Sequence, residues 1–214
     1  MNPRRRTLVL ALGLAPLSSF AQRRQLVPGV DYTELRPGQP VDSQGKIEVL
    51  EFFWYGCPHC YTLEPLLEKW IARLPADVQF RRVPAVFNDA WARDAAVFYT
   101  FEALGVLEKL HRPYYDAIHR DRLNTRNPAA LAQWLEKNGV DTKKFDEALK
   151  SFGVQSRVRR AGQQSVAYRI DGTPALAVHG RYTVSAEQAR TQAGMLAIAE
   201  NLIGVARKGA TGAK

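Results

Sequence analysis

Short apolar runs separated by turn residues divide the chain into strand-like and helix-like segments. Residues 46–54 are apolar on both faces near their end, which is typical of a central strand covered on both sides. Gly56 and Pro58 end this run, and apolar residues at helical spacing follow from about 57 to 73. Residues 78–86 again have a strand pattern. A strand, a helix and a second strand are therefore predicted here.

The middle of the chain is helical by pattern. Asn88, Asn127 and Asp141 each stand where a helix N-cap is expected, and each precedes an apolar stripe at helical spacing. The stripe that follows Asp141 runs through Phe152, and Gly153 is expected to end that helix.

Strand patterns return near the C-terminus. After a basic helix over about 154–168, two strand-like runs at 174–178 and 181–184 are separated by a His-Gly pair, which predicts a hairpin. A serine-capped final helix is expected over about 185–206.

The helical block from 88 to 168 is much longer than a usual connection between strands. It predicts an α-helical subdomain inserted into an α/β domain, which is then discontinuous and consists of residues 22–87 and 169–208. Residues 209–214 are expected to form a flexible tail.

The first 21 residues have the pattern of a cleaved export signal. A basic start precedes an apolar run over 8–17, and Ser19 and Ala21 stand at the spacing that a signal peptidase accepts. The run is short for a permanent membrane anchor. We therefore expect cleavage after about Ala21, a periplasmic location and no stable membrane insertion. The pair Arg5-Arg6 leaves both the general and the twin-arginine export routes open.

The formal net charge of +9 comes from 30 Lys and Arg against 21 Asp and Glu. Three of these positive charges, at positions 4–6, belong to the expected signal, so the mature chain carries 9 − 3 = +6. Arg157, Arg159 and Arg160 lie on one predicted helix and are read as a solvated face. Because no aromatic residues interleave with them and the chain is exported, we expect no nucleic-acid partner.

Both cysteines of the chain, Cys57 and Cys60, lie where the first strand turns into the first helix. A two-residue gap closes too small a loop to stabilise the fold much, so the pair is better placed to react. Cys57 should sit at the helix N-terminus, where unpaired N–H groups and the helix dipole favour an anion. His59 adds a possible cation. Both effects lower a thiol pKa, so Cys57 is the predicted nucleophile and Cys60 the resolving thiol.

A low pKa at Cys57 has a redox consequence. If the pKa of Cys57 fell to about 4, the folded protein would stabilise the thiolate at pH 7 by about three pKa units, or about 4 kcal/mol. Only the reduced form is stabilised in this way, so the reduction potential would rise by roughly 90 mV. The alternative, half of a zinc site, needs further Cys or His ligands. No third cysteine exists, and His111, His119 and His179 have no suitable spacing. We therefore expect neither a metal nor a cofactor.

The sequence EFFWYGCPHC, followed more than a hundred residues later by GTPALAVHGRY, resembles the DsbA-type periplasmic thiol-disulfide oxidoreductases over essentially the whole mature chain. The resemblance implies a thioredoxin-like fold interrupted by a helical domain. It implies that Cys57 is the exposed nucleophile and Cys60 its buried partner. Pro58 and His59 would be the dipeptide that tunes the potential.

The resemblance also implies a cis proline at Pro174 that faces the disulfide, with the backbone of Thr173 pairing with an extended substrate strand. A trans proline that opens an edge strand is the local alternative. The best-studied members have valine before this proline, so Thr173 bears on redox tuning and on partner choice.

Glu51 matches a buried acid of the family that exchanges a proton with Cys60. Glu64 and Arg82 match further members of a charged cluster, although Arg82 and Glu51 could equally form a plain structural ion pair. Tyr55 is expected at the rim of a groove for unfolded substrates, with a place in the core as the alternative.

These inferences predict a monomeric oxidoreductase that donates its Cys57–Cys60 disulfide to newly exported proteins through a mixed disulfide at Cys57. The family implies a DsbB-like, quinone-linked membrane partner that reoxidises the pair. Two other functions stay open. One is a disulfide reductase or isomerase, and the other is a peptide-binding chaperone in which the cysteines have no role.

Overall fold

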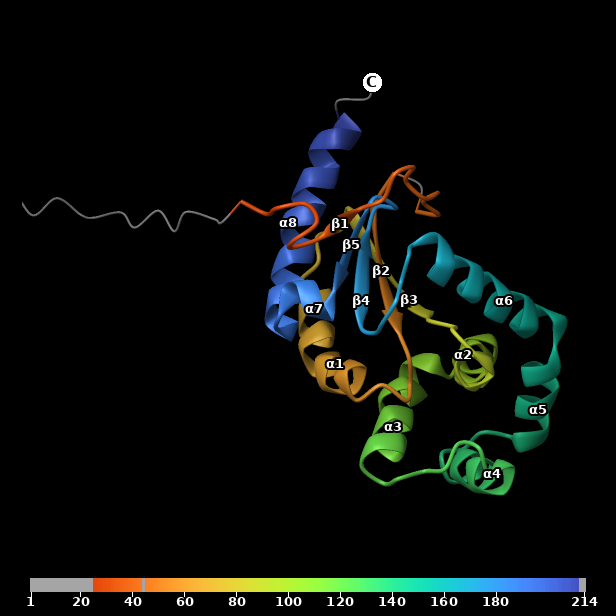
Figure 1. The fold of residues 1–214 in the computed structure, drawn as a ribbon. Coiled ribbons are helices and arrows are strands. Elements are labelled where there is room, and N and C mark those ends of the chain that lie inside the picture. Colours follow the sequence, from red (N-terminus) through yellow and green to blue (C-terminus); the bar gives the residue numbers. More distant parts are fainter. Residues whose placement is uncertain (1–24, 44, 212–214) are drawn as a thin grey trace, which may run out of the picture.

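A mixed five-stranded sheet forms the centre of the computed structural model, which describes residues 25–43 and 45–211 (Figure 1). The predicted signal over 1–21 and the last three tail residues lie outside this range. The strand order is β1-β5-β4-β2-β3, and only β2 and β3 run parallel. The strands are β1 (Thr33–Glu34), β2 (Ile47–Phe53), β3 (Val78–Pro84), β4 (Ala175–Val178) and β5 (Tyr182–Ser185).

Helices cover both faces of this sheet (Figure 1). Helices α1, α7 and α8 lie on one side, and α2 to α6, which stand between β3 and β4 in the sequence, lie on the other. The helices of the described residues are α1 (Pro58–Ile71), α2 (Asp89–Ala103), α3 (Leu107–His119), α4 (Pro128–Lys137), α5 (Thr142–Lys150), α6 (Phe152–Ala167), α7 (Ala186–Ala189) and α8 (Gln192–Thr211). The predicted α/β fold with an inserted helical subdomain is confirmed.

Strand β2 is buried over its whole length, as its apolar pattern predicted. Ile47 and Val49 pack into a core that α1 and α8 complete, whereas Leu50 and Phe52 pack into a second core with the inserted helices. Because both faces are covered, the end of β2 is held firmly where the two cysteines follow.

The predicted caps are confirmed, but one helix boundary is wrong. The side chains of Asn88, Asn127 and Asp141 accept hydrogen bonds from the first backbone N–H groups of α2, α4 and α5. Helix α5 ends at Lys150, and Ser151 caps the next helix, so Phe152 begins α6 and is 82% exposed. Because a serine cap starts the new helix before the glycine is reached, the glycine at 153 does not end a helix.

The C-terminal part also differs in detail from its prediction. The expected final helix is two helices, because Arg190 adopts a left-handed conformation with φ of 60° between α7 and α8. Helix α8 continues to Thr211, so residues 209–211 are helical and do not begin the flexible tail. The hairpin between β4 and β5 is confirmed, with positive φ at His179 and Gly180.

Candidate active site

Cys57 is the N-cap residue of α1. Its backbone is extended, Pro58 takes the first helical position, and its Sγ accepts a hydrogen bond from the backbone nitrogen of Cys60 at 3.4 Å. Both cysteines are free thiols. Cys57 is 6% exposed and Cys60 is fully buried. Cys60 is the more deeply buried of the two, but Cys57 is buried as well, so the exposed nucleophile that the resemblance implied is not found here.

The two sulfurs have opposite acid–base character. A hydrogen bond from the side chain of Cys60 is the main cause that lowers the pKa of Cys57 to about 5, against the opposing effect of burial. A hydrogen bond with the side chain of Thr173 and the backbone N–H groups of Cys60 and His59 lower it further. Burial raises the pKa of Cys60 well above its usual value. A thiolate at Cys57 beside a protonated Cys60 is the result.

His59 contributes to the site through its backbone. The backbone N–H of His59 supports the thiolate, and a charge on its ring, a possible cation beside Cys57, stays a prediction. Its ring is exposed to solvent, as is Pro58. The peptide N–H groups at the start of α1 and the partner thiol together stabilise the thiolate of Cys57.

Thr173 and Pro174 face Cys57 from the loop before β4. Their peptide bond is cis, as the resemblance implied. The carbonyl oxygen of Thr173 lies 3.3 Å from Sγ of Cys57, at a distance where a thiol donates to it. Pro174 is buried and Thr173 is partly exposed. The loop therefore brings the backbone of Thr173 next to the sulfur of Cys57.

Glu51 is fully buried in β2, six residues before Cys57. It is paired in register with Arg82 on β3, and its Oε2 lies 3.3 Å from the Nε of Arg82. Burial, followed by the charge of Glu64, raises the pKa of Glu51 to about 8, and Arg82 opposes this rise. Glu51 is therefore mostly a neutral acid at pH 7, able to give up a proton.

A second buried acid, Glu64 on α1, joins the same cluster. It forms an ion pair with Arg82, and His111 on α3 lies 3.6 Å from its other oxygen. Burial raises the pKa of Glu64, but His111 and Arg82 outweigh burial and keep it below its usual value. Arg82 thus balances one ionised and one neutral carboxyl group.

His111 was missed by sequence reasoning. It is buried, its pKa is lowered by burial, and its Nδ1 lies 2.9 Å from the hydroxyl of Tyr55. The apolar face of α3, with Tyr114 and Tyr115 next to this histidine, was the available signal. The sequence pattern alone does not separate a helix over 107–119 from the rest of the helical block.

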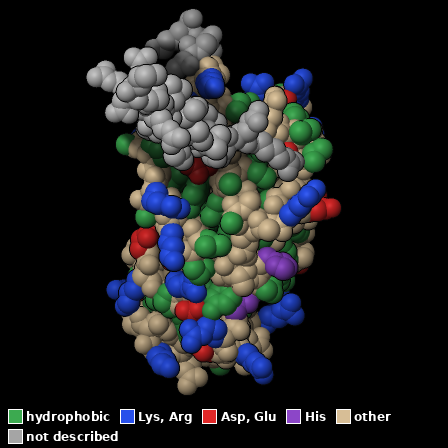
Figure 2. Space-filling model, turned by 90° about the vertical axis from the view of Figure 1, so that its left-hand side faces the viewer, with side chains coloured by type: hydrophobic (Ala, Val, Ile, Leu, Met, Phe, Trp, Pro, Cys, Tyr) green, Lys and Arg blue, Asp and Glu red, His purple; other side chains and the backbone are tan. Residues whose placement is uncertain are grey.

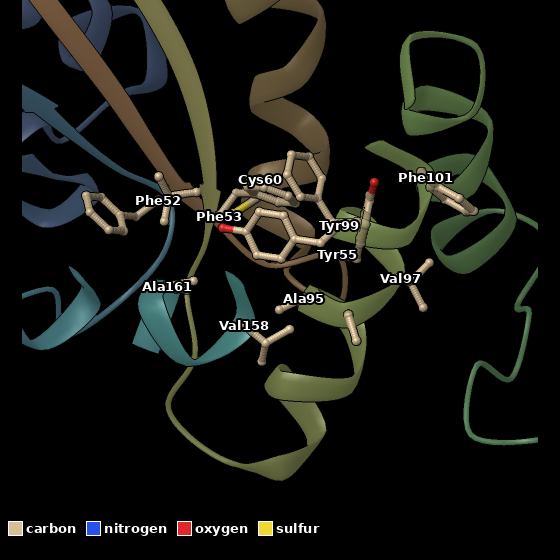
Figure 3. Close-up of a cluster of buried hydrophobic side chains, with 14 of the residues drawn as sticks. Phe52, Phe53, Tyr55, Cys60, Ala95, Val97, Tyr99, Phe101, Val158 and Ala161 are labelled. Carbon is tan, nitrogen blue, oxygen red and sulfur yellow. The ribbon is translucent and has the colours of Figure 1, made fainter. Parts of the chain in front are cut away.

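Tyr55 does not form the rim of a groove. It is 1% exposed, and its ring packs at centroid distances of 5.3 Å from Phe53 and 4.7 Å from Tyr114. Figure 3 shows Tyr55 and Phe53 beside Cys60 in this cluster. The core alternative is therefore the correct one, because the inserted helices cover the side chain.

Partly exposed aromatic side chains lie elsewhere near the cysteines. Trp54 stacks on Trp91 of α2 at 4.4 Å, and its Nε1 donates to Asp94 at 2.6 Å. Phe87, which is 42% exposed, packs on Trp91 in turn. Trp54 joins the end of β2 to the inserted helices.

Among the described residues on one face, the basic side chains are scattered. On the face in Figure 2, hydrophobic side chains gather in the middle, and Lys and Arg side chains are spread around the edges. Arg157 pairs with Glu102 and Arg160 with Asp42, as expected of a solvated face.

Within residues 25–43 and 45–211, no group of three or more His, Cys, Asp or Glu is placed to hold a metal ion. None of the described helices is long and apolar enough to cross a bilayer.

Comparison with known proteins places this site in a family. Residues 48–196 match the model of the DSBA-like thioredoxin domain. The chain is 41% identical over 206 residues to the thiol:disulfide interchange protein DsbA of Azotobacter vinelandii, covering 92% of this chain and 96% of that protein. It is 38% identical over 201 residues to DsbA of Pseudomonas aeruginosa, covering 92% and 95%.

Solved structures agree with the sequence matches. The crystal structure of Pseudomonas aeruginosa DsbA superposes with a TM-score of 0.81 at 38% identity, over 86% of this chain and 95% of that one. The oxidoreductase NmDsbA1 of Neisseria meningitidis gives 0.75 at 29% identity, over 87% and 96%. The chain therefore belongs to the DSBA-like thioredoxin domain family and is a thiol:disulfide oxidoreductase.

Proposed function

We propose that this protein donates its Cys57–Cys60 disulfide to reduced, unfolded proteins that have been exported to the periplasm. The observation that carries the proposal is the pKa of Cys57, lowered to about 5 beside a Cys60 whose pKa is raised. A stable thiolate favours the reduced form, so the disulfide is a strong oxidant. The export pattern of residues 1–21 supports the cellular setting, and the similarity to thiol:disulfide interchange proteins supports the reaction.

The reaction begins when a substrate thiolate attacks Sγ of Cys57. The Cys57–Cys60 bond breaks, a substrate–Cys57 disulfide forms, and the bonding electron pair stays on the sulfur of Cys60. Because the pKa of Cys60 is raised, this sulfur takes up a proton. Glu51, whose pKa is raised to about 8, is the proposed donor of that proton.

A second substrate thiolate completes the exchange. It attacks the substrate sulfur of the mixed disulfide, and Cys57 leaves as a thiolate. A sulfur with a low pKa is a good leaving group, so the same property that makes Cys57 acidic speeds its release. The substrate loses two electrons, and the protein gains them as its disulfide becomes the dithiol form. The backbone of Thr173, next to Cys57, is proposed to pair with the substrate strand meanwhile.

The dithiol form must then pass its electrons on. A DsbB-like, quinone-linked membrane protein is the proposed acceptor, and the protein is proposed to act as a monomer. A reductase or isomerase would run the same exchange in the opposite direction, and a chaperone would need neither sulfur. The low pKa of Cys57 favours the oxidant.

A synthetic peptide with two cysteines tests the direction of exchange. The oxidised protein should convert the dithiol peptide to its disulfide one for one, while its own cysteines appear as thiols. Cys57→Ala should abolish this conversion. Cys60→Ala that starts as a Cys57 mixed disulfide with glutathione should accumulate a peptide–Cys57 adduct with a single-cysteine version of the peptide, because neither Cys60 nor a second substrate thiol is there to resolve it. Net reduction of a peptide disulfide at neutral pH would contradict the proposal, and activity that survives Cys57→Ala would favour a chaperone.

A further inference from the structure

The residues just before Cys57 form a tight turn. The backbone nitrogen of Cys57 donates to the carbonyl of Trp54 at 3.0 Å, which closes a four-residue β-turn. Tyr55 and Gly56 are its two central residues. This turn links the end of β2 to Cys57, the N-cap of α1. It therefore sets the direction of the backbone that leads into the nucleophile.

The peptide between Tyr55 and Gly56 has two available orientations in such a turn. A type I turn and a type II turn share the closing hydrogen bond and differ in the direction of this central peptide. Type II requires a positive φ at the third residue, which glycine adopts without cost. Gly56 is not in that left-handed region here, so the turn holds the other orientation.

Local sequence does not force that choice. The closing bond fits both orientations, and glycine tolerates both, so something outside the turn selects one. Glycine is needed at this position for another reason. The indole of Trp54 lies against Gly56, and a Cβ there would collide with its ring.

His119, on the last turn of α3, contacts the central peptide directly. Its Nε2 lies 2.8 Å from the carbonyl oxygen of Tyr55, and since a carbonyl only accepts, Nε2 carries the proton and donates. The imidazole is held in place by Tyr61 of α1, whose ring stacks on it at 4.7 Å with an angle of 13°. Tyr61 is fixed in turn by its hydroxyl, which donates to Asp116 at 2.8 Å.

We propose that His119 is a positioning residue that locks the Tyr55–Gly56 peptide in one orientation and thereby fixes the chain at Cys57. The inserted helical subdomain then has a direct part in the active site, because α3 supplies the hydrogen bond that the turn lacks. In the flipped orientation the carbonyl of Tyr55 would leave His119, and Gly56 would enter the left-handed region. The peptide that precedes the nucleophile would then be reoriented.

Two amide variants separate this role from a general loss of packing. In His119→Gln the side-chain amide nitrogen reaches about as far as Nε2, whereas in His119→Asn it stops about one bond short. We expect His119→Asn to broaden or double the NMR amide signal of Gly56 and to lower the acid dissociation constant of Cys57 about threefold or more, a rise of about half a pKa unit. His119→Gln should keep one Gly56 signal and the wild-type titration. Thiolate ultraviolet absorbance of the reduced protein follows that titration.

Arg120→Ala is the matched control, since Arg120 is the exposed C-cap residue of α3 next to His119, and its side chain lies 3.9 Å from the partly buried Asp116. Arg120→Ala should change neither the amide signal of Gly56 nor the titration of Cys57. The proposal is overturned if His119→Asn lowers the melting temperature but leaves the Gly56 signal and the Cys57 titration unchanged, or if His119→Gln behaves like His119→Asn. The inference rests on Cys57 being the nucleophile. The titration does not depend on the direction of disulfide exchange, so a failure of the donor function would be seen separately.

Discussion

Glu51 and Arg82 are cross-strand partners inside the protein, yet neither carboxyl oxygen of Glu51 has a hydrogen-bond partner among the described residues. The Oε2 of Glu51 and the Nε of Arg82 lie 3.3 Å apart, but they do not have the geometry of a hydrogen bond. Arg82 instead directs a terminal nitrogen to Glu64. Of the two acids, Glu51 is therefore the one that is left to carry a proton.

Glu51→Gln should separate the proton-donor role from a structural one. Glutamine resembles the neutral acid but cannot release a proton, so reduction of the oxidised protein by a dithiol peptide should slow by about tenfold or more. Stopped-flow measurement of that step at pH 7 checks this. An unchanged rate would leave Glu51 a structural residue.

The same variant has a stability signature with a defined sign. A folded-state pKa raised to about 8 stabilises the protein fully below the usual value of 4.5, and this stabilisation is lost as pH rises through about 8. In urea unfolding of the oxidised form, the wild type should therefore lose stability relative to Glu51→Gln between pH 5 and pH 8. If the free energies of unfolding of the two proteins changed with pH in parallel, the pKa of Glu51 would not be raised in the folded protein.

Arg82→Ala should be strongly destabilising. It removes the cation that faces two buried carboxyl groups and leaves an uncompensated buried charge, which costs about 3–5 kcal/mol. Arg157→Ala is the control, because it breaks an ion pair between side chains that are 51% and 46% exposed and should cost about 0–1 kcal/mol. Urea unfolding of both variants measures the difference. Equal losses would mean that the buried cluster holds no ionised carboxylate.

Tyr55→Phe tests the contact between the active-site loop and His111. It leaves Nδ1 of a buried histidine without its partner at 2.9 Å, so a loss of about 1–3 kcal/mol is expected in urea unfolding. Tyr115→Phe offers a close comparison, since the buried hydroxyl of Tyr115 has no hydrogen-bond partner in the described part of the chain. Its removal should be neutral or stabilising. Similar effects of the two changes would argue against the Tyr55–His111 bond.

The sequence was sufficient wherever local pattern and local chemistry decide structure. The buried strand over 47–53, the caps at Asn88 and Asn127, and the Cys57–Cys60 pair at a helix start were all predicted from residues close in sequence. The cis peptide before Pro174 came from the family resemblance alone.

The contacts that the sequence did not predict are tertiary. His111 and His119 have no metal-like spacing, and their partner Tyr55 stands more than fifty positions away. Tyr55 follows the strand in the same way as a residue at a groove rim would, and the packing of the inserted helices buries it. The break at Ser151 was missed because one serine ends a helix and caps the next.

The reduced form should be stabilised by the Cys57 thiolate in a pH-dependent way. Because the pKa of Cys57 is lowered from 9.0 to about 5, this stabilisation is fully present above about pH 9 and is lost as pH falls through about 5. The melting temperature of the dithiol form relative to the disulfide form should therefore drop between pH 8 and pH 4. A difference that stays constant over this range would contradict the lowered pKa.

The reduction potential of the Cys57–Cys60 pair tests the central claim most directly. Equilibration with defined mixtures of reduced and oxidised glutathione at pH 7, followed by quantification of the free thiols, measures it. We predict a potential well above the roughly −270 mV of thioredoxin, with the pair already reduced in mixtures that would leave a thioredoxin disulfide oxidised. A potential at or below about −270 mV would contradict the account, because the thiolate at Cys57 would then not drive disulfide donation.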